Sequence, residues 1–137
     1  MSDKIILLVE DNPGDEALTL RALKKNSIEH EVVVAHDGAE ALEYLFGEGA
    51  YAGRDTNVMP DLILLDLRLP KIDGLEVLQR LRANELTENI PIVVLTSSDA
   101  DKDLIDSYNL GANCYLRKAA RHLGMSMLSL DEVLTKA

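Results

Sequence analysis

Reactive side chains stand directly after several apolar stretches of this sequence. In chain order they are Glu10 with Asp11, Asp66, Thr96 and Lys118. A carboxylate at the end of a buried strand is costly to desolvate unless a cation or a hydrogen-bond donor meets it. Because two apolar stretches deliver three carboxylates to their ends, we expect these acids to form one site. A divalent cation suits such a site.

Three of these residues also have a simpler interpretation when they are taken alone. Asp66 can cap the turn that follows its strand, and Lys118 can be an ordinary surface lysine. Thr96 can begin a helix, although Ser98 or Asp99 suits that role better. An α/β domain can place one or two such residues by chance, whereas the whole set in this order favours a common site.

The apolar stretches themselves predict the strands of a parallel sheet. Residues 62–65 are consecutive aliphatic residues, which is typical of a strand buried on both faces. The strands expected are residues 5–9, 31–35, 62–66, 90–95 and 113–117. In an open parallel sheet, ligands bind outside the carboxyl ends of the strands, where the reactive side chains would meet.

Helical stretches alternate with these strands. They are expected at residues 13–26, 38–46, 75–84 and 99–110, the last ending at Gly111. The apolar face of the first should consist of Ala17, Leu18, Ala22 and Leu23. Strands that alternate with helices imply right-handed parallel crossovers, and therefore a three-layer α/β sandwich.

The composition indicates one domain with an acidic balance of charge. The chain has 137 residues, of which 47% are hydrophobic and 28% charged, as in an ordinary globular protein. Its net charge of −10 argues against a nucleic-acid surface, which needs a basic stripe. The single cysteine, Cys114, excludes an internal disulfide and fits a reducing cytoplasm. The N-terminal residues fit neither a signal peptide nor a membrane span.

Residues 47–59 interrupt the alternation of helices and strands. This stretch contains Gly47, Gly49 and Gly53 and shows neither helical nor strand periodicity. It is also longer than the usual connection of about two to six residues between a helix and a strand. We interpret it as a surface insertion. Tyr51 and Arg54 are residue types common in recognition, so the stretch favours contact with a partner over structural filler.

The set of reactive residues resembles the response-regulator receiver domain of two-component signalling. The residues that carry the resemblance are Glu10-Asp11, Asp66, Pro70 with Asp73-Gly74, Thr96 and Lys118. The likeness spans about residues 4–118 and implies a flavodoxin-like, doubly wound sheet of five parallel strands in the order 2-1-3-4-5. Residues 1–137 would then be a single receiver domain. The stretch between Tyr44 and Pro60 is further similar to single-domain regulators paired with phytochrome-type kinases.

The resemblance implies a role for each residue of the site. Asp66 is the phosphoacceptor, a carboxylate that attacks phosphorus and becomes an acyl phosphate. Mg²⁺ would be bound directly by Asp11, by Asp66 and by the backbone carbonyl of Arg68. Glu10 would reach the ion through water. Lys118 would supply a positive charge to the phosphoryl oxygens.

Two further residues are implied to form a switch, and the sequence departs from the family near its end. Thr96 would turn its hydroxyl toward the new phosphoryl group, and Tyr115 would rotate into the space behind it. The family usually has proline after the lysine, whereas Ala119 stands here. Residues 119–137 fit the last helix of the family poorly, because Gly124 interrupts them.

The resemblance also implies partners. A sensor histidine kinase would donate the phosphoryl group, and the narrower likeness suggests a kinase of the phytochrome type. A homodimer is suggested through the fourth helix, the fifth strand and the C-terminal segment. Neither nucleic acid nor a membrane is expected as a partner. We expect a cytoplasmic signalling domain that is slowly dephosphorylated, not an enzyme with turnover.

Three other functions fit the sequence less well. An aspartyl-phosphate phosphohydrolase usually has a second Asp two positions after its nucleophile, where this chain has Arg68. A flavodoxin-like cofactor binder needs donors in its first loop, and Glu10-Asp11 would repel a phosphate there. An adaptor that acts without phosphorylation would not need the complete acceptor set.

Overall fold

The computed structural model describes residues 4–25, 30–67, 69, 71–96 and 114–117, with only the backbone described for Thr96 and residues 114–117. The predicted helix at 99–110 and the segment 119–137 lie outside the described residues. No helix within the described part of the chain has the length and apolar character needed to span a membrane.

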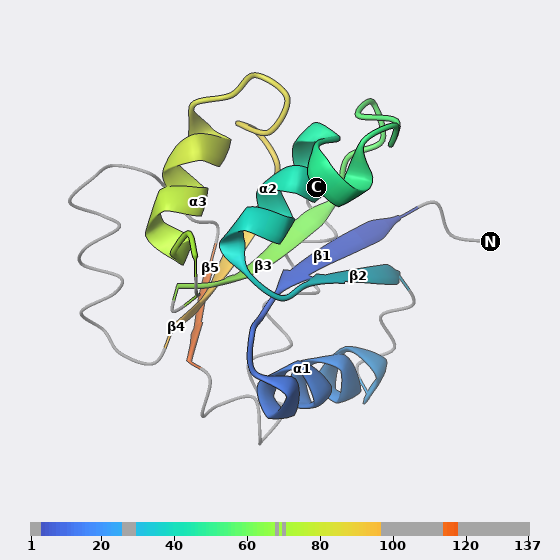
Figure 1. Cartoon of the computed structure of the whole chain (residues 1–137). Helices are drawn as coiled ribbons and strands as arrows, with labels where there is room; N and C mark the ends of the chain where they lie inside the picture. Colours follow the sequence, from blue (N-terminus) through green and yellow to red (C-terminus); the bar gives the residue numbers. More distant parts are fainter. Residues whose placement is uncertain (1–3, 26–29, 68, 70, 97–113, 118–137) are drawn as a thin grey trace.

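A sheet of parallel strands runs through the middle of the molecule (Figure 1). The strands are β1 (Ile5–Val9), β2 (Glu31–Ala35), β3 (Leu62–Asp66), β4 (Ile92–Thr96) and β5 (Cys114–Arg117). Their order is β2-β1-β3-β4-β5, and each neighbouring pair is parallel. The expected flavodoxin-like fold and strand order are thus confirmed.

Helices cover both faces of this sheet. The helix α1 (Pro13–Lys25) lies on one face, and α2 (Gly38–Phe46) and α3 (Gly74–Arg82) lie on the other (Figure 1). Successive side chains of a strand point to opposite faces of the sheet. Alternate residues therefore pack against α1 on one face and against α2 and α3 on the other. In β3, for example, Leu64 packs in the core beneath α1, whereas Ile63 and Leu65 pack beneath α2 and α3.

The boundaries of these elements follow local chemistry. The side chain of Asp37 accepts a hydrogen bond from Glu40 N at the start of α2, and Gly47, in the left-handed region, ends it. Strand β4 begins at Ile92, later than predicted. The reason is that the amide of Ile90 bonds to the carbonyl of Thr87, and Pro91 has no N–H to donate.

The apolar face predicted for α1 is partly wrong. Ala22 and Leu23 are buried as expected, but Ala17 is exposed and Thr19 is fully buried in its place. Positions 19, 22 and 23 have the spacing of one helical face. The threonine is small enough to lie on that face, and a count of aliphatic residues alone overlooks it.

The insertion after α2 is folded onto that helix. It contains the short 3₁₀ helix η1 (Gly49–Tyr51), which the sequence did not predict. The guanidinium of Arg54 donates to the carbonyls of Tyr44, Leu45 and Val58 and lies 4.3 Å from the centre of the Tyr44 ring. The last carbonyls of a helix have no partner within it, and Arg54 supplies one. The Arg54 side chain, which had suggested a partner contact, therefore anchors the insertion internally.

Candidate functional site

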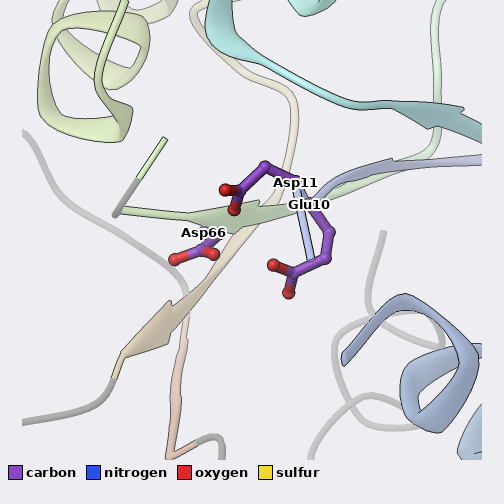
Figure 2. Close-up of side chains that lie close together, drawn as sticks. All are labelled: Glu10, Asp11 and Asp66. Carbon is purple, nitrogen blue, oxygen red and sulfur yellow. The ribbon is translucent and has the colours of Figure 1, made fainter. Parts of the chain in front are cut away.

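The register of two neighbouring strands brings the acids together. Val9 of β1 pairs with Leu65 of β3, so the next residues, Glu10 and Asp66, lie side by side at the carboxyl ends of the two strands. Asp11 follows at once. One carboxylate oxygen from each of the three residues lies within 4.8 Å of the others. Figure 2 shows these carboxylates gathered at the ends of the two strands, as the sequence predicted.

The three acids differ in their exposure to solvent. Glu10 is 0% exposed and Asp66 is 1% exposed, whereas Asp11 is exposed. Buried carboxylates of the same charge repel one another unless a cation or several donors compensate them. The exposed Asp11 marks the side from which an ion or an incoming group can enter.

The donor set fits a hard divalent cation. All three side chains offer carboxylate oxygens, the ligands preferred by Mg²⁺, Mn²⁺ and Ca²⁺. The cluster contains no thiolate or imidazole, the ligands typical of a structural zinc site. The acidic cluster is therefore able to hold a hard divalent metal ion.

Backbone contacts hold the first two acids in place. The amide of Glu10 donates to the carbonyl of Ala35 at 2.9 Å, which extends the pairing of β1 and β2 by one residue. The side chain of Asn12 accepts a hydrogen bond from the amide of Asp15 at 3.0 Å. Because Asn12 directly follows Asp11, this cap fixes the point at which the chain turns from the site into α1.

The third acid is held by a close contact with α3. A Cβ atom at Gly74 would lie only 2.3 Å from the carbonyl oxygen of Asp66. The amide of Gly74 also donates to the carbonyl of Leu67 at 3.0 Å. Asp73-Gly74 was predicted as part of a motif, but this contact was not predicted. An Asp-Gly pair soon after a strand-end acid is the signal that could have suggested it.

The remaining predicted residues stand at the same edge of the sheet or outside the described part. Thr96 is the last residue of β4, and its backbone pairs with Arg117 of β5. Because Asp66 pairs with Leu95, Thr96 stands one position beyond the residue paired with Asp66. The backbone of Tyr115, on the edge strand β5, pairs with that of Val94, two residues before the end of β4. Arg68 and Lys118 lie outside the described residues.

An open parallel sheet with an acidic cluster beside its central strand defines a class of α/β protein that binds its ligand at the carboxyl ends of the strands. The family model of the response regulator receiver domain matches residues 6–125 of this chain. The chain therefore belongs to the receiver-domain family, and it is a domain of two-component signal transduction.

Relatives with known roles are similar over most of their length. Response regulator Rcp1 of Synechocystis sp. is 46% identical over 116 residues, which cover 85% of this chain and 77% of Rcp1. The Mn²⁺-bound structure of Rcp1 superposes with a TM-score of 0.77 at 41% identity, covering 92% of both chains.

Two further solved structures are similar. The bacteriophytochrome response regulator RtBRR has a TM-score of 0.86 and 44% identity, covering 95% of this chain and 77% of that one. The phosphorylated cyanobacterial phytochrome response regulator RcpA has a TM-score of 0.82 and 42% identity, covering 99% and 97%.

Proposed function

We propose that Asp66 accepts a phosphoryl group from a histidine kinase in a reaction that requires Mg²⁺. The observation that carries this proposal is the cluster of Glu10, Asp11 and Asp66, whose carboxylate oxygens lie within 4.8 Å at the carboxyl ends of β1 and β3. A phosphorylated structure of RcpA and a Mn²⁺-bound structure of Rcp1 support it by similarity.

Asp66 is the acid best placed to be the nucleophile. It ends the central strand β3, and its backbone is fixed by the contact with Gly74. A carboxylate oxygen of Asp66 attacks the phosphorus of phosphohistidine, the P–N bond breaks, and its electron pair returns to the imidazole of the kinase. The product is an acyl phosphate on Asp66.

The other acids prepare the site for a negatively charged group. Asp11 and Asp66 would hold Mg²⁺ directly, Glu10 through water, and Arg68 through its carbonyl. Bound there, Mg²⁺ supplies the positive charge that lets a phosphoryl group approach three carboxylates. Lys118 adds a second positive charge, and Thr96 offers a hydroxyl to the phosphoryl oxygens.

The same arrangement supports a signalling role without turnover. Hydrolysis of the acyl phosphate is accelerated when a second acid stands two positions after the nucleophile, and Arg68 stands there. The phosphorylated state should therefore persist long enough to be read by a partner. We propose a cytoplasmic location, in keeping with the single cysteine.

We further propose a phytochrome-type kinase as the donor. The support is the similarity to RtBRR and RcpA, whose names assign them to phytochrome systems. Phosphotransfer to this protein from a purified phytochrome-type kinase should be faster than from an unrelated histidine kinase that is autophosphorylated to the same extent. Equal rates from both kinases would contradict this assignment.

A homodimer through the fourth helix, β5 and the C-terminal segment is also proposed. The position of β5 as the last strand of the described sheet supports it, because an edge strand can pair with a strand of a second chain. Sedimentation velocity with and without acetyl phosphate tests it. A monomer in both states would contradict the proposal.

The main proposal is tested by the intact mass of the protein. Incubation with acetyl phosphate and Mg²⁺ should add one phosphoryl group, and hydroxylamine should remove it. The same incubation with EDTA should add none. A phosphoryl group that resists hydroxylamine would not be an acyl phosphate and would overturn the proposal.

A further inference from the structure

The helices α2 and α3 begin with the same pair of residues. Asp37 accepts a hydrogen bond from the amide of Glu40 at 2.7 Å, and Asp73 accepts one from the amide of Glu76 at 2.9 Å. The first helical residue is Gly38 in α2 and Gly74 in α3. Glycine is a poor helix former, so its presence at both positions requires a reason.

In each case the reason is that backbone atoms of another segment occupy the space that a side chain at the glycine would need. A Cβ atom at Gly38 would lie 1.9 Å from the carbonyl oxygen of Ile72 and 2.8 Å from its carbonyl carbon. A Cβ atom at Gly74 would lie 2.3 Å from the carbonyl oxygen of Asp66. Neither clash can be relieved by a side-chain rotation, because the atoms in the way are backbone.

Together these contacts connect α2 with the proposed phosphoacceptor. Ile72 stands two residues before Gly74 in the loop that joins β3 to α3. The start of α2 contacts this loop at Ile72, and the start of α3 contacts the end of β3 at Asp66. The two helices lie side by side on the same face of the sheet (Figure 1). The loop is therefore held between them.

The residue before Ile72, Lys71, has an unusual backbone conformation in this loop. Lys71 has a φ of 65°, a left-handed conformation that side chains with a Cβ rarely adopt. Its ammonium group lies 3.4 Å from a carboxylate oxygen of Asp37, the cap of α2. Lys71 is largely exposed, so this ion pair is weak. The packing of Gly38 against Ile72 is the stronger restraint.

We propose that Gly38 is a positioning residue for Asp66. It lies on α2, whereas the acid cluster lies at the ends of β1 and β3. The close approach that Gly38 allows fixes the backbone at Ile72, and this restraint helps to keep Asp66 beside Asp11. This inference rests on the proposed function where it concerns phosphorylation. Its effect on the backbone of the loop does not depend on that function.

The test compares Gly38→Ala with Leu45→Ala. Leu45 is fully buried on the same helix, about 10 Å further along its axis. Its replacement leaves a cavity and destabilises the protein. The amide exchange rates of the two variants are compared in urea-free buffer. Each rate is corrected for the free energy of unfolding of its own variant. Hydrogen exchange of the Gly74 amide is the first measurement, because this amide reports the loop through its bond to Leu67.

We expect Gly38→Ala to increase the exchange rate of the Gly74 amide about tenfold beyond the increase due to global destabilisation. The affinity for Mg²⁺ alone, measured by titration without a phosphodonor, should fall about tenfold, as for other residues that support metal ligands. Leu45→Ala should show neither effect. Equal corrected exchange rates and equal Mg²⁺ affinities in the two variants would overturn the proposal.

Ile72→Gly keeps the test decisive if Gly38→Ala does not fold. It loosens the backbone of the residue that Gly38 contacts, without introducing a clash. After the same correction for the free energy of unfolding, the Gly74 amide should exchange faster than in the wild type, and an unchanged rate would overturn the proposal. If Gly38→Ala shows both effects but the wild type is not phosphorylated on Asp66, the proposed function fails and the positioning role stands.

Discussion

Glu10 and Asp66 lie side by side at the carboxyl ends of neighbouring strands, because the residues before them, Val9 and Leu65, are paired in the sheet. Both carboxylates are buried, whereas Asp11, next along the chain, is exposed. The site is therefore buried at Glu10 and Asp66 and open to solvent at Asp11. The predictions below separate the roles of these residues from those of the surrounding structure.

Asp66→Asn should abolish phosphorylation, because an amide is a far weaker nucleophile than a carboxylate. Intact mass after incubation with acetyl phosphate and Mg²⁺ is the measurement. Asp73→Asn is a matched control, since asparagine also caps a helix and Asp73 is exposed. The assignment is wrong if Asp66→Asn gains the same hydroxylamine-labile mass as the wild type.

Asp11→Asn should weaken Mg²⁺ binding more than Glu10→Gln. A direct ligand loses charge and geometry on substitution, whereas a ligand that acts through water is partly replaced. We expect a loss of about ten- to a hundredfold for Asp11→Asn. Titration with Mg²⁺ measures both, and Asp15→Asn serves as a control outside the cluster. Wild-type affinity in both variants would exclude the metal site.

Thr96→Ala should still be phosphorylated but should respond weakly to it. A change from 1:99 to 99:1 in favour of the active state requires about 5.5 kcal/mol. One hydrogen bond to a charged group supplies about 1.5–3 kcal/mol, so Thr96 and Lys118 must act together. Hydrogen exchange over residues 99–117, with and without acetyl phosphate, measures the response. A full response in Thr96→Ala would rule out this coupling.

Arg54→Lys should destabilise the protein by about 1–3 kcal/mol, because an ammonium group cannot reach the carbonyls that the guanidinium binds together. Arg80→Lys is the control, since Arg80 forms an exposed ion pair with Glu76 that contributes at most about 1 kcal/mol. Urea unfolding gives both values. Similar losses in the two variants would show that Arg54 does not anchor the insertion. Phosphorylation should be unchanged in both.

Tyr51→Phe should change the dependence of stability on alkaline pH. Burial and the hydrogen bond to Glu40 raise the pKa of the Tyr51 phenol above its usual value near 10. A raised pKa contributes stability that is fully present below about pH 10 and is lost as the pH rises through the folded-state value. The free energy of unfolding should therefore fall less steeply above about pH 10 in the variant. Identical slopes, by urea unfolding at several pH values, would count against this contribution.

Much of the fold could be predicted because its elements have strong local signals. The consecutive aliphatic residues before Asp66 can be accommodated only where both faces of a strand are covered, and β3 is buried throughout. Caps such as Asp37 act within one helical turn, so the start of α2 was also predictable. The acids at the strand ends follow directly from these assignments. The strand order came from the resemblance to the receiver family, which the comparisons confirm.

Tertiary structure decided the features that depend on contacts distant in the chain. The burial of Thr19 depends on how α1 is rotated against the sheet, and local periodicity left that rotation uncertain. Arg54 is a recognition-type residue by composition, yet it binds the end of α2 because unpaired helix carbonyls lie within its reach. The contact of Gly38 with Ile72 exists only once two helices and a loop are packed. The sequence thus determined which groups stand at the ends of the strands, whereas packing determined what holds them there, because steric contacts form only between elements already in place.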